Sequence, residues 1–153
     1  MSTPTHITMF DGKRRGPLVD YFRPYPDQIR TSLNTLDGAS SWAYSLWRVP
    51  KGKDINDAPY SETFLQAAGS AEGMTIEMRT VETDGTPHHF VVGKPCTDPS
   101  APLTRIISWA DGAHSTAVRD GEVFTADEAA EIFYAYFLTD AVPTSCTLRE
   151  MAA

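Results

Sequence analysis

The side chains best suited to acid–base or metal chemistry are two adjacent histidines, His88 and His89, and two cysteines, Cys96 and Cys146. Neighbouring side chains of a strand point to opposite faces, so His88 and His89 are badly placed to share one metal ion. Neither cysteine has a second cysteine or a histidine at the spacing of a zinc site. We therefore expect no metal and no cofactor, and a disulfide between the two cysteines stays open.

The motifs of the common enzyme classes are missing from the 153 residues. The sequence has no Gly-x-Ser-x-Gly elbow for a nucleophilic serine and no phosphate-binding Gly-x-x-x-x-Gly-Lys loop. Pro95-Cys96 is not followed by the second cysteine of a zinc deaminase. Carboxylate pairs such as Glu77 with Glu82 are expected by chance among 20 acidic residues. The sequence therefore indicates a protein that is not an enzyme.

The charge of the chain is negative and unevenly distributed. The net charge is −7, and residues 111–153 contain eight acidic residues against two basic ones, whereas residues 1–50 carry a small basic excess. This balance argues against direct binding to nucleic acid or to an anionic membrane. No apolar run approaches the roughly 20 residues of a spanning helix, and the N-terminus lacks the pattern of a secretory signal. We expect a cytoplasmic protein.

The first half of the chain predicts one helix and two strands after an extended or irregular segment, residues 1–22. A helix is expected to begin near Pro26, because proline suits the first helical turn and Ile29, Leu33 and Leu36 form one apolar stripe. Residues 42–49 alternate as a strand with one buried face, and residues 63–68 favour a second strand.

Two Asp-Gly pairs predict hairpins in the second half. Asp84-Gly85 separates strand candidates at 74–81 and 88–93, and Asp111-Gly112 joins 103–110 to 113–118 as a two-residue turn. The last helix is predicted from the capping box Thr125-Ala-Asp-Glu128 and ends before Pro143. Together these elements predict an α+β fold in one domain, 1–153: a mainly antiparallel sheet with an early helix and a C-terminal helix packed on it.

The order of several segments resembles a known family. These are 63–69 (TFLQAAG), 90–94 (FVVGK), 122–130 (EVFTADEAA) and 133–138 (FYAYFL), followed by a proline. This pattern, over about residues 30–145, resembles immunity proteins of bacterial polymorphic toxin systems, in the family commonly paired with deaminase toxins. The resemblance implies a non-enzymatic inhibitor that binds and occludes a cognate toxin domain, one that acts on nucleic acid or nucleotides.

Surface chemistry suggests where such a partner is bound. Trp109 precedes a hairpin turn beside acidic segments, and an aromatic ring among carboxylates is a common form of protein-binding hot spot. Toxins that act on nucleic acid tend to present basic clefts, which an acidic protein complements. We therefore predict a basic partner surface and a contact set comprising Trp109, Asp111, Asp120, Glu122, Asp127 and Glu128.

The sequence leaves two other functions open. One is a small-molecule-binding or enzymatic α+β domain with His88, His89 and Cys96 near its pocket. The other is an oligomerisation module that binds no ligand. A toxin gene beside this one favours the immunity protein, whereas a deep pocket with perturbed titratable groups favours the enzyme.

Overall fold

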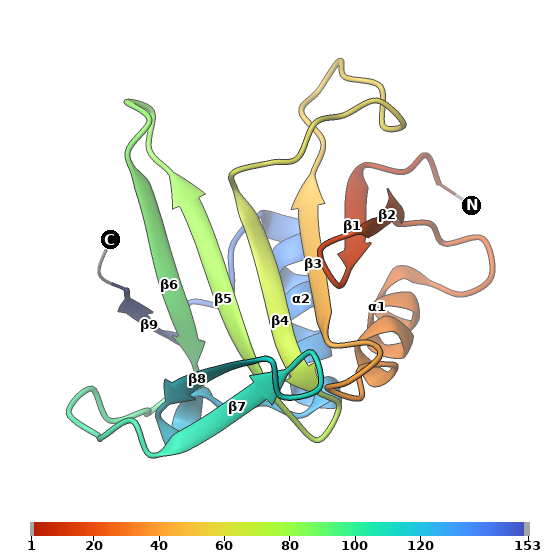
Figure 1. Cartoon of the computed structure of the whole chain (residues 1–153). Helices are drawn as coiled ribbons and strands as arrows, with labels where there is room; N and C mark the ends of the chain where they lie inside the picture. Colours follow the sequence, from red (N-terminus) through yellow and green to blue (C-terminus); the bar gives the residue numbers. More distant parts are fainter. Residues whose placement is uncertain (1, 152–153) are drawn as a thin grey trace.

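The computed structural model describes residues 2–151 and has two helices on one face of a seven-stranded sheet (Figure 1). The strand order is β2-β1-β3-β4-β5-β6-β9, every neighbouring pair is antiparallel, and β7 and β8 form a separate two-stranded sheet. The elements are β1 (His6–Phe10), β2 (Arg14–Pro17), α1 (Tyr25–Asn34), β3 (Ala43–Arg48), β4 (Phe64–Ser70), β5 (Gly73–Val81), β6 (Pro87–Gly93), β7 (Arg105–Trp109), β8 (His114–Val118), the 3₁₀ turn η1 (Asp120–Glu122), α2 (Ala126–Thr139) and β9 (Thr147–Glu150).

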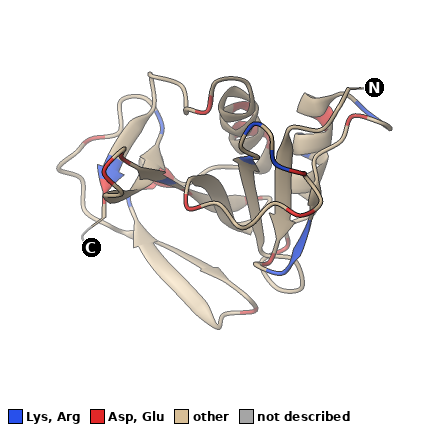
Figure 2. Cartoon of the chain, turned by 90° about the horizontal axis from the view of Figure 1, so that it is seen from above, with Lys and Arg blue, Asp and Glu red and all other residues tan. Residues whose placement is uncertain are grey.

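This architecture confirms the predicted α+β fold with an early helix and a C-terminal helix on a mainly antiparallel sheet. Seen from above, the helices lie on one side of the sheet and the β7–β8 hairpin lies on the other (Figure 2). No helix among the described residues is long and apolar enough to cross a membrane.

Helix α1 forms where the sequence predicts it. Pro26 occupies the first turn, and Ile29 and Leu33 are buried on the stripe that faces the sheet. The helix stops before Asp37, and Gly38 adopts a positive φ of 81°, which glycine reaches without a steric penalty. The chain then turns back into β3.

Strand β3 is buried on both faces, whereas the sequence predicted one buried face. Tyr44 and Leu46 point to the main core beneath the helices. Trp47 points the other way and packs with Ile7 and Ala58 in a second cluster. The second face is covered because the long connection between β3 and β4 folds over it, and no periodicity within β3 reports that contact.

Both predicted hairpins form, but the second has a longer turn than expected. The β5–β6 pair closes through Asp84-Gly85. In β7–β8 the last pair is Trp109 opposite His114, so the turn has four residues, of which Ala110, Asp111 and Gly112 take positive φ. The predicted two-residue turn is too short, because the ladder ends at Trp109 and His114. Each strand therefore stops one residue further from Asp111-Gly112 than predicted.

Helix α2 is the main support of the sheet. Thr125 Oγ1 accepts the Glu128 N–H at 3.3 Å, and Glu128 Oε1 accepts the Thr125 N–H at 2.9 Å, which confirms the predicted capping box. Phe133 is fully buried against Tyr44, with 5.5 Å between ring centroids. Burial of a side chain of this size contributes about 1.5–3 kcal/mol.

Three strands add to the sheet at its two ends. Residues 1–22 contain the β1–β2 hairpin, which extends the sheet beside β3. At the opposite end, β9 pairs with β6 after a connection that returns from α2. No pattern in the sequence predicted this last strand.

Candidate functional site

The aromatic member of the predicted contact set, Trp109, is only partly exposed. It packs against the cluster of Val91, Ile107, Val118 and Val123 that holds β7–β8 to the sheet, and it stacks on His114 with centroids 6.1 Å apart. Its first role is therefore to anchor the hairpin.

The exposed apolar side chains on this part of the chain are different ones. Ile106, in the middle of β7, is 65% exposed, and Leu103, just before the strand, is 45% exposed. Side chains alternate along a strand, so the burial of Ile107 turns its neighbour Ile106 outward.

Asp111 is exposed at the tip of this hairpin and sits on the connection after α1. Its backbone N–H donates to the Gly38 carbonyl at 3.0 Å. Next to Gly38, the Asp37 carboxylate accepts the N–H groups of Ala39 and Ser41 and the hydroxyl of Ser40, at 2.8–3.0 Å. These hydrogen bonds, above all that from Ser41, lower the pKa of Asp37 to about 2, so its charge persists at every physiological pH.

Asp127 and Glu128 are exposed in the first turn of α2, where the helix dipole favours negative charge. Asp127 lies 3.7 Å from Arg30, and Glu128 lies 3.2 Å from Lys94. The capping hydrogen bond from the Thr125 N–H is the largest cause of a lowered pKa at Glu128. Both carboxylates are therefore held in place by local contacts.

The turn between β4 and β5 brings these acidic segments together. The Ala71 N–H donates to the Leu36 carbonyl, and the Ala71 carbonyl accepts the Ala126 N–H, both at 2.8 Å. Glu72, the next residue, is exposed in this turn. We call the resulting surface the acidic rim; it comprises Asp37, Glu72, Asp111, Asp127 and Glu128.

The acidic rim carries more negative than positive charge. Two of its five carboxylates are paired with Arg30 and Lys94, while Asp37, Glu72 and Asp111 have no basic partner within residues 2–151. Three members of the rim, Asp111, Asp127 and Glu128, belong to the predicted contact set. The other two were missed because only the packing of the β4–β5 turn between the two helix ends brings them to this surface.

The two remaining predicted contacts lie elsewhere. Asp120 is exposed at the far end of β7–β8 and forms an ion pair with Arg105 at 2.7 Å. Glu122 is 1% exposed, so it does not face a partner, and its place in the contact set was wrong. The carboxylate of Glu122 instead accepts Nε and Nη2 of Arg149 at 2.9 Å each, and it accepts the Arg119 N–H at 2.8 Å.

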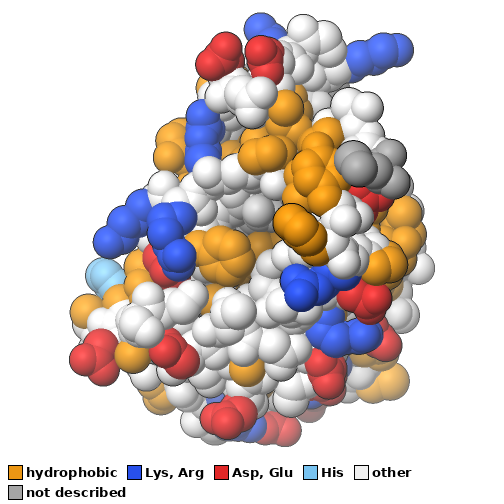
Figure 3. Space-filling model, turned by 90° about the vertical axis from the view of Figure 1, so that its right-hand side faces the viewer, with side chains coloured by type: hydrophobic (Ala, Val, Ile, Leu, Met, Phe, Trp, Pro, Cys, Tyr) orange, Lys and Arg blue, Asp and Glu red, His pale blue; other side chains and the backbone are white. Residues whose placement is uncertain are grey.

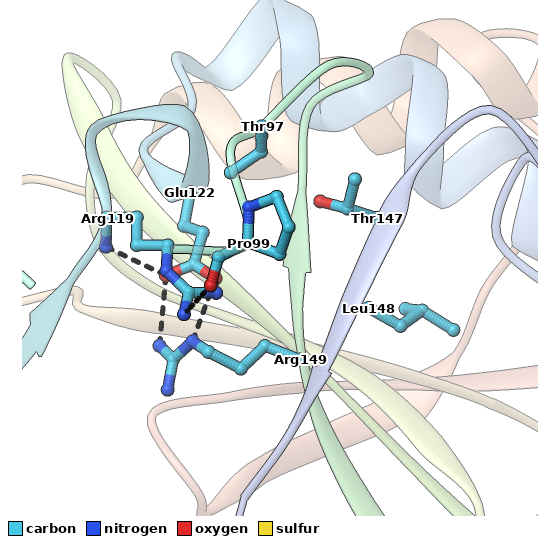
Figure 4. A pocket seen from close by; sticks show the side chains of 7 residues that line it. All are labelled: Thr97, Pro99, Arg119, Glu122, Thr147, Leu148 and Arg149. Carbon is cyan, nitrogen blue, oxygen red and sulfur yellow. Dashed lines mark hydrogen bonds and ion pairs between the residues drawn. The ribbon is translucent and has the colours of Figure 1, made fainter. Parts of the chain in front are cut away.

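Glu122 lies at the back of a cavity of about 480 Å³ lined by two guanidinium groups (Figure 4). Arg119 donates to the carbonyls of Pro99 and Ala101, and its Nη1 is 3.8 Å from Glu122. These contacts of the two arginines join η1, β9 and the loop after β6. The cavity has no nucleophile held beside a base.

The residues considered for an enzyme site are dispersed in the structure. His88 and His89 point to opposite faces, as the sequence predicted: His88 contacts Glu150 at 2.7 Å, and His89 contacts Glu77. The Glu150 carboxylate is the largest cause of a raised pKa at His88. Cys96 and Cys146 are both free thiols. Within residues 2–151, no group of three or more His, Cys, Asp or Glu side chains is placed to hold a metal ion.

The side of the molecule opposite β9 carries basic side chains next to hydrophobic ones (Figure 3). The guanidinium of Arg14 lies 5.4 Å from the ring centroid of Phe10, and that of Arg15 lies 4.7 Å from Tyr60. Both cations are residues of β2, the edge strand at this end of the sheet, and Lys or Arg on an edge strand discourages pairing with other chains. The basic cluster therefore protects this edge.

Comparison with known proteins yields no match: no family model, no curated protein and no solved structure is similar to this chain. The function is therefore inferred from two observations: the geometry of the site and the sequence pattern described above.

Proposed function

We propose that this chain is a non-enzymatic immunity protein, which binds and occludes a basic toxin domain that acts on nucleic acid or nucleotides. The observation that supports the proposal most strongly is the acidic rim, in which four separate segments of the chain present five exposed carboxylates on one surface. A cleft that binds phosphate groups is basic, and carboxylates in fixed positions compete for it.

The carboxylates of the acidic rim are preorganised. Asp37 is held by three hydrogen bonds, and Glu128 is held by its capping bond and by Lys94. A charge that is already fixed loses little conformational entropy when a partner binds. An excess of negative charge also speeds the encounter with a basic partner, and the effect weakens as salt increases.

Apolar contact area is available beside the charges. Ile106 is exposed on the same hairpin whose tip carries Asp111, and Leu103 lies just before it. An apolar side chain surrounded by polar groups is the usual composition of a binding hot spot. The β7–β8 hairpin therefore supplies both the apolar and the acidic part of the proposed interface.

The proposal is tested by protection of bacterial cells. The chain is co-expressed with the toxin domain encoded by the neighbouring gene, and we expect growth to be restored. The variant Glu72→Lys/Asp111→Asn is expected to bind the toxin at least about 10-fold more weakly and to protect less well. Asparagine is chosen because position 111 has a φ of 55°, which asparagine tolerates.

A matched control changes charges at the other end of β4. Asp57 and Glu62 are exposed before β4, and Asp57→Asn/Glu62→Lys changes the net charge by +3, the same amount as Glu72→Lys/Asp111→Asn. We expect Asp57→Asn/Glu62→Lys to protect as the native chain does. Full protection by the rim variant, or the same loss from both variants, contradicts the proposal.

A further inference from the structure

The last strand of the sheet, β9, leaves one side of its backbone open. The Met151 N–H donates to the His89 carbonyl at 2.8 Å, and β9 pairs antiparallel with β6. In an antiparallel ladder, alternate residues direct their backbone groups to the same neighbour. Arg149 and Thr147 therefore face β6, while the N–H and C=O groups of Leu148 and Glu150 face outward. No backbone group within residues 2–151 pairs with these four groups.

The two ends of the sheet differ in how they treat this open backbone. At the first edge, β2 contains Pro17, which has no N–H, and carries the cluster at Lys13–Arg15. Both features hinder the addition of another strand. At the other edge, β9 has neither proline nor a run of like charges, and it exposes Leu148 by 45%. The β9 edge is thus the one able to accept a further strand.

A positive charge lies beside this edge. The cavity next to β9 contains Arg119, Arg149 and Glu122, which together carry a net charge of +1 (Figure 4). Arg149 uses Nε and Nη2 for Glu122, and its Nη1 has no hydrogen bond within the described residues. Pro99 adds an apolar wall. A carboxylate brought to this cavity finds a free guanidinium donor and an uncompensated charge.

We propose that the β9 edge binds an extended peptide segment as an additional antiparallel strand, with an acidic side chain of the segment opposite Arg149. The segment's residues opposite Leu148 and Glu150 exchange backbone hydrogen bonds with them. The residue between is then in a non-hydrogen-bonded pair with Arg149, with Cα atoms about 4.5 Å apart and both side chains on the face of the cavity.

The neighbouring positions define the rest of the motif. Leu148 and Glu150 lie on the other face of β9, so they favour an apolar and a basic residue opposite them, respectively. Because the added strand runs antiparallel, the preferred order is Lys-Glu-Val. A second copy of this chain fits poorly: pairing Leu148 with Glu150 of the other copy sets Arg149 against Arg149, and like charges directly opposite destabilise a pair.

The test uses synthetic peptides and the full chain. The probe is acetyl-Thr-Lys-Glu-Val-Thr-amide, titrated into ¹⁵N-labelled protein and followed by NMR. We expect a Kd on the order of 100 µM, with chemical-shift changes at the backbone amides of Leu148 and Glu150. Glutamine in place of the peptide's glutamate is expected to weaken binding about 10-fold. Methylation of the backbone nitrogens of the peptide's Lys and Val is expected to abolish binding, because both N–H groups are needed as hydrogen-bond donors to β9.

These controls alter only the peptide, so no variant of the protein has to fold. Absence of binding at millimolar peptide overturns the proposal, as does equal affinity for the glutamine peptide. Shifts confined to residues away from β9 overturn it as well. Protection of the Leu148 and Glu150 amides in the free protein, together with a dimer in sedimentation, assigns the edge to a second copy instead. None of these outcomes depends on a toxin, so the proposed function is tested separately.

Discussion

Replacing Glu122 by glutamine is expected to lower the free energy of unfolding by about 3–5 kcal/mol. The Glu122 carboxylate is 1% exposed and forms a bidentate ion pair with Arg149 while accepting the Arg119 N–H. Glutamine has one acceptor oxygen and no charge, so it leaves the Arg149 guanidinium without its counterion. Since a domain of this size is stable by about 5–15 kcal/mol, we expect a much lower midpoint in urea with an unchanged slope.

The matched control is Asp120→Asn. Asp120 is two residues away and also pairs with an arginine, but its side chain is 84% exposed. Exposed pairs contribute little, so we expect a change within about 1 kcal/mol. If the two variants unfold at the same urea concentration, the buried pair is not what holds η1 and β9 to the sheet.

Acid is expected to destabilise the protein through His6. This imidazole is buried, packs against the tilted ring of Phe137 with centroids 4.5 Å apart, and forms a hydrogen bond between its Nδ1 and Thr5 Oγ1 at 2.8 Å. Desolvation, with a smaller contribution from the Arg48 charge, lowers its pKa from 6.5 to about 4, and Asp140 opposes the shift. The folded state therefore binds the proton less well than the unfolded state.

For a histidine with a lowered pKa, the stabilising contribution is complete above about pH 6.5 and is lost as the pH falls towards 4. We expect a loss of about 2 kcal/mol between about pH 7 and about pH 5. The contribution of His88 to stability changes with pH in the opposite direction, because its raised pKa favours the folded state at low pH.

The variant His6→Phe separates these contributions. It keeps a ring of similar size against Phe137 and removes the titrating group, while His88 stays in both proteins. Urea unfolding of the two proteins across this pH range measures the difference. If the free energy of unfolding depends on pH in the same way in His6→Phe and in the native chain, the role of His6 is contradicted.

The elements predicted correctly are those whose signals lie within a few residues. The capping box at Thr125 and Glu128 and the turn at Asp84-Gly85 depend on local hydrogen bonds and backbone angles, which sequence spacing reports directly. These short-range signals were enough to predict the fold class.

The errors concern contacts between distant segments. Glu122 is buried because Arg149, 27 residues later, reaches it from β9. No pattern around position 122 distinguishes it from the exposed Asp120. In the same way, Asp37 and Glu72 join the acidic rim only because the β4–β5 turn packs between the ends of α1 and α2. A surface formed by several segments is therefore only partly visible in the sequence.

The most direct test of the acidic rim is a hydrogen-exchange footprint of the complex with the toxin domain encoded by the neighbouring gene. We predict that binding slows exchange at the β7–β8 hairpin around Ile106 and Asp111, at Glu72, and at the start of α2. The connection between β3 and β4, on the other side of the molecule, is expected to be unchanged. Protection of that connection with unchanged exchange at the rim contradicts the proposed binding surface.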